Sequence, residues 1–185
     1  MKRESGILLP VSSLPSRYGI GCFSKEAYEF VDHLSEAGQS YWQILPLGPT
    51  SYGDSPYQSF STFAGNPYFI SLEDLIEEGV LTREECDSAD FGKKQDSIDY
   101  AKLYRHRFPL LRKAYERSNI SENREFLRFQ AENRWWLRDY AIYMAVKARF
   151  EQKAWTEWAE DIRLRWDNAM DYYQRELYFD IEFHE

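Results

Sequence analysis

The chain has 185 residues, of which 43% are hydrophobic, so we expect a sizeable core in one domain or in one domain with an appendage. Its net charge of −8 comes without an offsetting basic run, which makes nucleic acids and anionic membranes poor partners. No stretch is long and apolar enough to span a bilayer, and Glu4 interrupts a start too short for a signal peptide. Cys22 and Cys86 lie far apart without metal spacing, so we expect reduced thiols and a cytoplasmic protein.

The first third of the chain predicts a β-α-β unit. Residues 6–10 form a short apolar run between helix breakers, which predicts a buried strand. Ser24 can cap a helix that Gly38 is placed to end, and residues 41–47 predict a second strand. Strands joined in this way pair in parallel, and α/β proteins build their sites in the loops that follow such strands.

From Ser71 onward the pattern is helical. No glycine follows Gly92 and no proline follows Pro109, and Thr82 with Glu85 fits a capping box. Pro109 should kink or split the helix predicted over 98–117. Two apolar stripes at spacings of three and four predict the buried faces of further helices. Their members are Phe126, Phe129, Asn133, Leu137, Tyr140, Met144 and Ala148, then Trp155, Trp158, Ile162, Trp166, Ala169, Tyr173 and Leu177.

Two loops carry the chemically informative residues. The first, 9–21, is rich in prolines and hydroxyls, and its Gly-x-Gly lacks the third glycine of a dinucleotide site. The second, 48–68, interleaves aromatic rings with short hydrogen-bonding side chains, the mixture that a sugar ring requires. Its candidates are Tyr52, Asp54, Ser55, Tyr57 and Gln58. From composition alone, a surface loop held by Asx and Ser/Thr turns is favoured over a sugar site for this segment.

No metal or cofactor site is expected. His33 falls on the predicted first helix as a solvated or packing residue, and His106 and His184 have no companions at metal-ligand spacing.

Several segments together resemble the amylomaltase family of 4-α-glucanotransferases (disproportionating enzymes, glycoside hydrolase family 77). The segments are RESGILLP at 3–10, SSLP at 12–15, YGIG at 18–21, YWQILPLGPT at 41–50, YGDSPYQ at 52–58 and GNPY at 65–68, with WLRDYA at 136–141 and WTEW at 155–158 in the helical part. The resemblance extends over essentially the whole chain, which corresponds to the amino-terminal third of a family member.

The resemblance implies an α/β fold, the start of an interrupted (β/α)₈ TIM barrel followed by a mainly α-helical insertion. It implies transfer of an α-1,4-glucan segment to the 4-position of an acceptor, either a glucan or glucose. The implied mechanism is retaining: one carboxylate is the nucleophile, and a second carboxyl group acts first as acid and then as base. In the family both groups lie on later strands, so no catalytic residue and no cofactor is expected here. The partners implied are maltooligosaccharides, amylose, glucose and the remainder of the same polypeptide.

The resemblance also suggests roles for single residues. Tyr57 matches a tyrosine that packs against the sugar beside the scissile bond, and Ser55 matches a residue lining the same cleft. Tyr52 matches an aromatic residue of an additional glucan-binding groove, which Tyr100 would join. Asp54 is expected to hold the loop rather than to take part in the chemistry.

A two-stranded sheet has unpaired edges, and a closed barrel needs about 250 residues, so we expect a truncated chain. The expected division is 1–70, with the first two β/α units, and 71–185, a helical subdomain. By itself the chain is predicted to be inactive. Two alternatives remain: a non-catalytic glucan-binding module that uses the 48–68 loop, and a helical interaction domain.

Overall fold

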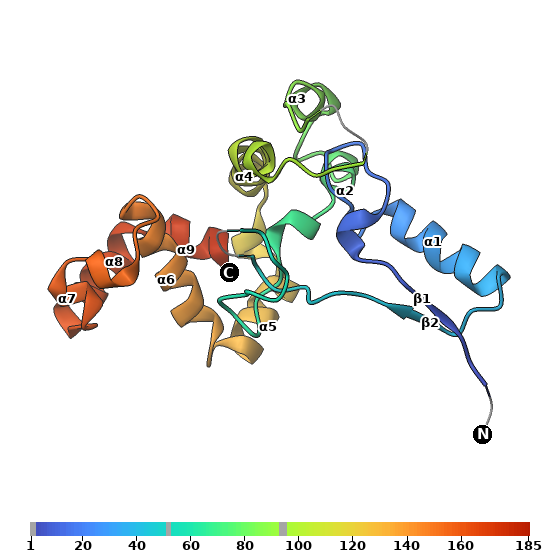
Figure 1. Cartoon of the computed structure of the whole chain (residues 1–185). Coiled ribbons are helices and arrows are strands. Elements are labelled where there is room, and N and C mark those ends of the chain that lie inside the picture. The colour runs from blue at the N-terminus through green and yellow to red at the C-terminus, as the bar shows by residue number, and fades with distance from the viewer. Residues whose placement is uncertain (1–2, 51–52, 93–95) are drawn as a thin grey trace. The chain divides into compact units, whose positions relative to one another are not determined.

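The computed structural model describes residues 3–50, 53–92 and 96–185, which fall into two compact units, 1–118 and 119–185 (Figure 1). The first unit contains β1 (Gly6–Leu8), η1 (Val11–Ser13), α1 (Lys25–Glu36), β2 (Tyr41–Gln43), η2 (Pro67–Phe69), α2 (Leu72–Glu77), α3 (Arg83–Asp87) and α4 (Tyr100–Arg117). The second contains η3 (Ile120–Glu122), α5 (Arg124–Asn133), α6 (Leu137–Arg149), η4 (Trp155–Glu157), α7 (Glu160–Arg163), α8 (Asp167–Glu176) and α9 (Tyr178–His184).

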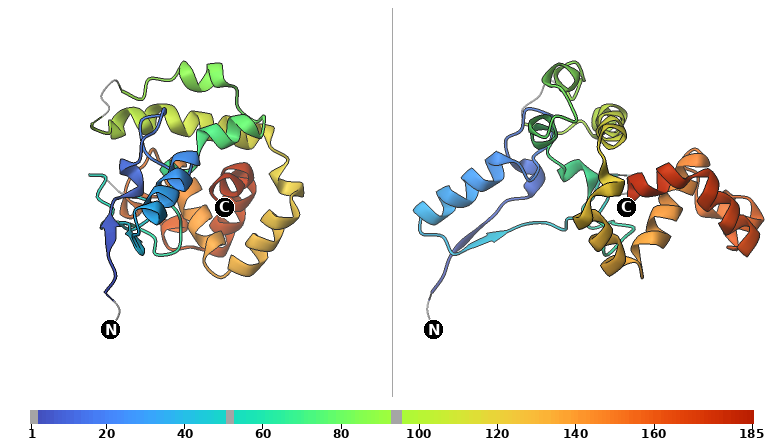
Figure 2. Two further views of the ribbon diagram at one scale, coloured as in Figure 1. Left: turned by 90° about the vertical axis from the view of Figure 1, so that its right-hand side faces the viewer. Right: turned by 180° about the vertical axis from the view of Figure 1, so that it is seen from behind.

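The predicted β-α-β unit is present. β1 pairs with β2 in parallel, with Ile7 opposite Trp42, and α1 runs along one side of the pair (Figures 1 and 2). Phe30 of α1 contacts Trp42 edge to face, with ring centroids 5.0 Å apart. The helix begins directly after Ser24, as predicted, although the Ser24 side chain bonds to Glu26 rather than to a backbone N–H group.

The prediction that the first strand is buried is wrong for this chain. Ile7 is 43% exposed and Leu8 57% exposed. Among the described residues the sheet has two strands, and the apolar cluster of α1 and the first loop gathers on one side of them. The core of this region therefore lies beyond the strand, around Val11, Leu14 and Ala27.

Helix α4 remains one continuous helix across Pro109, so the predicted split does not occur. Proline removes one backbone hydrogen bond and crowds the preceding turn. Here the buried face, which includes Leu103 before the proline and Leu110 and Leu111 after it, packs on both sides of Pro109 and holds the two halves in one helix.

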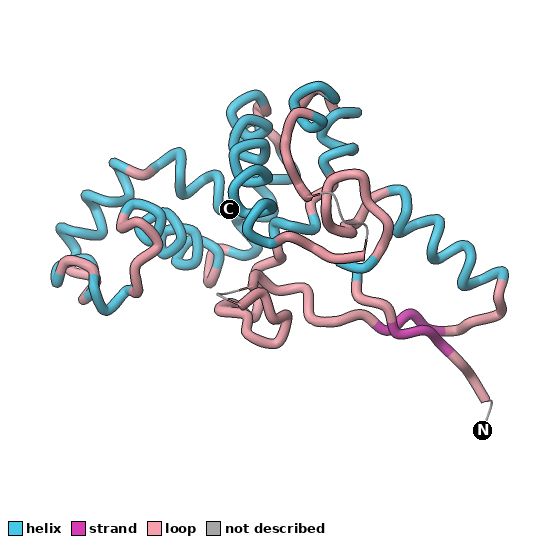
Figure 3. Tube along the Cα trace, turned by 45° about the horizontal axis from the view of Figure 1, so that its top comes forward, coloured by secondary structure: helices cyan, strands magenta, loops and turns pink. Residues whose placement is uncertain are grey.

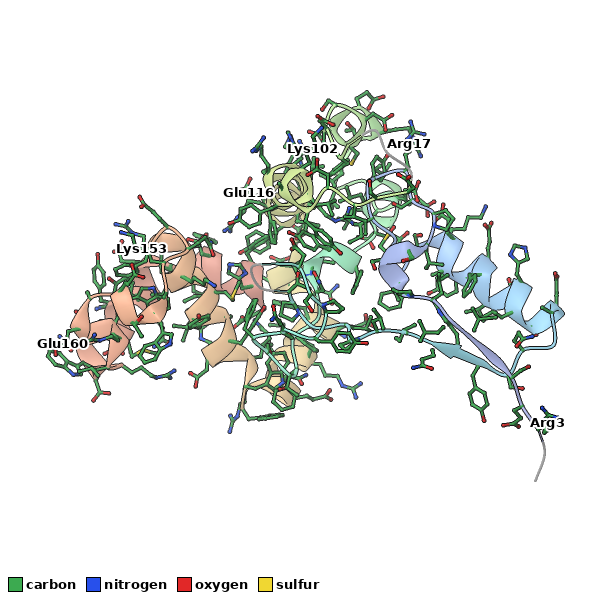
Figure 4. The ribbon with its side chains drawn as sticks, viewed as in Figure 1. Arg3, Arg17, Lys102, Glu116, Lys153 and Glu160 are labelled. Atoms are coloured by element: carbon green, nitrogen blue, oxygen red, sulfur yellow. The ribbon has the colours of Figure 1, made fainter. Side chains whose placement is uncertain are left out.

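Ion pairs connect α3 and α4 to the rest of the first unit. Arg17 forms a bidentate pair with Asp87 at the end of α3, with distances of 3.0 and 2.7 Å (Figure 4). Lys102 of α4 reaches Asp90 at 2.6 Å. The capping box predicted at α3 is confirmed, because Thr82 accepts from the backbone of Glu85 and Glu85 accepts from the backbone of Thr82.

In the second unit α6, α8 and α9 lie together (Figure 2), and an apolar core lies among them. The core residues are Ala141, Ile142, Ala145, Val146, Trp158, Ile162, Ala169, Leu177 and Ile181. The two predicted stripes are broken by loops and do not run along single helices. As a result Trp155 and Trp166, which have the spacing of core residues, are about half exposed, at 52% and 50%.

Candidate functional site

Two polar loops follow the carboxyl ends of the paired strands. The loop after β1 turns tightly through η1 and returns so that Gly21 donates its backbone N–H to Ser12 at 3.1 Å. A Cβ atom at Gly21 would lie 2.2 Å from the carbonyl oxygen of Val11, so no larger residue fits this crossing. The second glycine of the Gly-x-Gly, Gly21, is therefore explained by the close approach of two backbone segments.

The loop after β2 runs from Ile44 to η2 (Figure 3) and is held by its own polar groups. Thr50 and Ser59 form an isolated antiparallel bridge across it. Gln58 donates its backbone N–H to Ser55 at 3.0 Å, and Asn66 donates to Leu47 at 2.8 Å. These bonds hold the described part of the segment, 44–50 and 53–66, without regular secondary structure.

The two loops meet around a small cavity of about 30 Å³. Ser12 and Ile20 line it from the first loop, Asp54 and Pro56 line it from the second, and Tyr100 from α4 completes it. A water molecule needs roughly 10–15 Å³ measured in this way, so the cavity is too small for a sugar ring. The cavity marks the place where the two loops pack against each other.

Asp54 and two tyrosines form an electrostatic cluster at this junction. Asp54 has a left-handed backbone with φ 55°, and burial raises the pKa of its carboxyl group. Burial, and then the charge of Asp54, raises the pKa of Tyr68 to about 12, and the same two causes raise the pKa of Tyr100. The rings of Tyr68 and Tyr100 lie 6.1 Å apart. Both phenols therefore keep their protons at neutral pH and are available as hydrogen-bond donors.

The structure separates the candidate residues into two groups. Asp54 and Tyr100 line the same cavity. Tyr57 lies outside it with its side chain 73% exposed, and its backbone N–H donates to the Ser55 hydroxyl at 3.4 Å. Tyr52 falls outside the described residues. The sugar-binding roles of all five residues, Ser55 included, stay predictions.

Sequence reasoning missed Tyr68 and Arg107 as members of this region. Tyr68 belongs to the segment 65–68, and its place beside Asp54 could have been suspected from that motif. Arg107 is 1% exposed and donates to the backbone carbonyl groups of Tyr18 and Ile70, which lie in separate loops. Its helical position gave no signal, because a charged residue on an α-helix is usually solvated.

Within the described ranges, no three or more His, Cys, Asp or Glu side chains are grouped so that they could hold a metal ion. Across the same ranges, none of the helices has both the length and the apolar character that a membrane crossing requires. Both cysteines, Cys22 and Cys86, are buried free thiols.

Parallel strands, a connecting helix and polar loops at the carboxyl ends of the strands define an α/β protein with its candidate site in those loops. Comparison with known proteins makes the assignment specific. Residues 9–185 match the family described as 4-alpha-glucanotransferase, and the chain belongs to this family.

Similar proteins agree with that assignment. The 4-alpha-glucanotransferase of Streptococcus pneumoniae serotype 4 is 49% identical over 185 residues and that of Thermus thermophilus 42% over 188 residues, covering 99% and 100% of this chain. A solved amylomaltase from Streptococcus agalactiae, in complex with acarbose, is 40% identical, with a TM-score of 0.90 over 99% of the chain. In all three cases this chain spans 37% of the length of the matched protein.

Proposed function

We propose that this chain forms the amino-terminal part of a 4-α-glucanotransferase and supplies part of its glucan site. In this proposal residues 1–70 are the first two β/α units of a (β/α)₈ barrel, and residues 71–185 are a helical subdomain. The observation that carries the proposal is the family match over 9–185, together with the parallel pairing of β1 and β2. Parallel strands each followed by a substrate loop are the building units of such a barrel.

The substrates that we infer are α-1,4-glucans such as maltooligosaccharides and amylose, with a glucan or glucose as the acceptor. The exposed ring of Tyr57 supports this choice, because a free aromatic face can cover the C–H face of a pyranose. Ser55 would line the same cleft, and Tyr52 and Tyr100 would contact the glucan farther along. Asp54 would fix the loop, a role that its position at the junction between the two loops supports.

The reaction that we infer is a retaining transfer. A carboxylate attacks the anomeric carbon while a carboxylic acid protonates the leaving oxygen, and the acceptor hydroxyl then displaces the enzyme carboxylate with the second group acting as base. These two carboxyl groups would be supplied by barrel strands that follow the segment described here. We also infer a cytoplasmic setting, from the use of cysteine as buried free thiols.

A chimera tests the proposal. In the S. pneumoniae relative, the matching 37% of the protein would be replaced by this chain, and release of glucose from maltotriose would be measured. We expect the chimera to be active and the 185-residue chain alone to be inactive. If the chimera folds, as judged by circular dichroism, but does not act on maltotriose, the chain does not complete a glucanotransferase site. If the chain alone is active after contaminants are excluded, the carboxylates lie within it.

A further inference from the structure

The second unit contains a pocket that the function proposed above does not use. Its volume is about 260 Å³, and one face of α6 forms its base through Asp139, Ile142, Tyr143 and Val146. These positions are three and four residues apart, so they share one side of the helix. Segments from η4 to the start of α8 complete the walls, including Trp155 and Met170.

Aromatic rings form the apolar walls of this pocket. The rings of Tyr143 and Trp158 lie 5.3 Å apart. Trp158 is held in place because Phe150 stacks on it at 5.7 Å and its indole N–H donates to the backbone carbonyl of Lys153 at 3.3 Å. Trp155 also lines the pocket but remains 52% exposed, so a large apolar face borders the opening. Rigid, partly solvated indole faces are well suited to the C–H surface of a sugar.

The charged residues of the lining, Asp139, Arg163 and Arg165, make only weak contacts with their neighbours. Arg165 pairs with Asp139 at 2.7 Å, but both side chains are more than half exposed, at 55% and 61%. An exposed pair of this kind contributes little to stability, so each partner can exchange the other for a ligand hydroxyl group at low cost. Arg165 also has a left-handed backbone with φ 57°, which is uncommon for a bulky residue.

Not every N–H donor of the Arg163 guanidinium group has a well-placed acceptor among the described residues. Its Nε is buried without an acceptor in the part of the chain that the structure describes. Its Nη1 reaches the carbonyl oxygen of Thr156 at 3.4 Å, and its Nη2 lies 3.9 Å from Glu160 at the start of α7 (Figure 4). A guanidinium group offers five N–H donors, and buried polar groups in native proteins are normally satisfied.

We propose that this pocket binds one hexose ring at the end of an α-glucan chain. The volume is below the roughly 300–1,000 Å³ typical of pockets for drug-sized ligands, which favours a single ring. Aromatic faces with one carboxylate and two guanidinium groups match a ring that has C–H faces and an equator of hydroxyl groups. Because Asp139 and Glu160 balance the two arginines, a neutral sugar fits better than an anion.

This inference relies on the proposed function for the class of ligand, but it concerns a different place in the chain. Every residue that lines the pocket lies within 119–185, whereas the loop with Tyr57 lies within the first unit. The pocket would give the protein a second contact with its substrate, made by the helical unit alone.

The test is a titration of the 185-residue chain, labelled with ¹⁵N in its tryptophan indole groups, with maltose. We expect the indole signals of Trp155 and Trp158 to shift with a millimolar dissociation constant, as is usual for ligands of one or two rings. Trp155→Ala, followed through Trp158, should weaken binding about tenfold, and Asp139→Asn should weaken it several-fold. Trp135→Ala is the matched control, because Trp135 is 65% exposed in the same unit and does not line the pocket.

The proposal is overturned if saturating maltose shifts neither signal, or if Trp155→Ala binds maltose as Trp135→Ala does. It is also overturned if glucose 6-phosphate binds about tenfold more tightly than glucose, because the pocket is then an anion site. Circular dichroism of each variant excludes unfolding. The chimera assay is independent of this titration, so an active chimera with a silent pocket rejects only this inference, and a responding pocket with an inactive chimera rejects only the proposed function.

Discussion

Asp54 and Tyr57 are three positions apart in one loop, yet they have different surroundings. Asp54 is half-buried against the small cavity between the two loops, with its backbone in the left-handed region. Tyr57 extends into solvent, and its ring is free to contact a ligand. At the scale of single residues, the loop therefore has one residue packed at the junction between the two loops and another exposed to solvent.

Substitution of Tyr57 should affect turnover more than stability. In the chimera, we expect Tyr57→Ala to lower kcat/KM, with a loss of about 2–4 kcal/mol of transition-state stabilisation. The reason is the loss of one contact that strengthens as the sugar ring flattens. Tyr57→Phe should lose less, since the ring remains. Steady-state kinetics on maltotriose, with melting temperatures for each variant, make the comparison. Parent-like turnover by Tyr57→Ala would mean that the loop is structural.

Arg107 is a buried cation that connects separate loops. Burial lowers the pKa of its guanidinium group, which nevertheless donates to the carbonyl groups of Tyr18 and Ile70. Arg107→Ala should lower the free energy of unfolding by about 2–4 kcal/mol, because it removes the donors of the Tyr18 and Ile70 carbonyls and opens a cavity.

Thermal unfolding of Arg107→Ala and Arg105→Ala makes that measurement. Arg105 is exposed on the same helix, and its substitution should change stability by less than about 0.5 kcal/mol. Equal melting temperatures for the two variants would show that the free-energy cost of burying the Arg107 charge offsets the stabilisation from its hydrogen bonds.

At the scale of elements, one carboxylate joins α3 to α4. Glu85 contacts Lys113 at 3.0 Å and makes two bonds to Arg117 at 2.8 Å each. It also caps the backbone of Thr82. Bonds from Arg117, then Lys113 and the Thr82 N–H, hold the pKa of Glu85 well below its usual range. The Glu85 carboxylate thus caps the start of the short helix α3 and also bonds this helix to α4.

The contribution of Glu85 should depend on pH. Its pKa is depressed in the folded chain, so the stabilisation is complete above the unfolded pKa of about 4.3 and is lost as pH falls through the folded pKa. Glu85→Gln keeps a capping-box residue but removes the charge. Its melting temperature should fall below the parent's most strongly at pH 7, and the difference should shrink below about pH 4. Glu84→Gln, at an exposed neighbour, should show no such trend.

Pro109 offers a test of the continuity of α4. Because this residue is exposed within the helix, Pro109→Ala restores a donor to the carbonyl of Arg105 without disturbing the core. We expect the free energy of unfolding to rise by about 1–3 kcal/mol. The measurement is urea denaturation followed by circular dichroism. A lower midpoint would show that proline's restriction of the unfolded chain outweighs the missing bond.

At the scale of the whole molecule, the two-stranded sheet leaves apolar side chains exposed to solvent. Ile7, Leu8 and Tyr41 are between 43% and 60% exposed. We expect the purified chain to associate as its concentration rises and to bind a hydrophobic dye, because exposed apolar strands pair with one another. Light scattering after gel filtration measures this. Leu8→Lys should reduce association, whereas Leu127→Lys, at a 48% exposed position on α5, should not. A parent chain that stays monomeric with a sharp thermal transition would contradict the expectation.

Local signals in the sequence predicted several elements correctly. Ser24 and Gly38 bounded α1, Thr82 and Glu85 marked the start of α3, and the order strand, helix, strand implied parallel pairing. The family was also recognisable, because most of its motifs are continuous runs of residues in the two strands and in the loops that follow them.

Contacts between side chains that are distant in sequence could not be predicted and became visible in the folded chain. The cavity shared by Asp54 and Tyr100, the buried bonds of Arg107 and the pocket between α6 and α7 each join segments far apart in the chain. Periodicity placed Trp155 and Trp166 in a core, but the chain turns at both residues and leaves them half exposed. The physical reason is that helical spacing describes one face of one helix, whereas burial depends on what packs against that face.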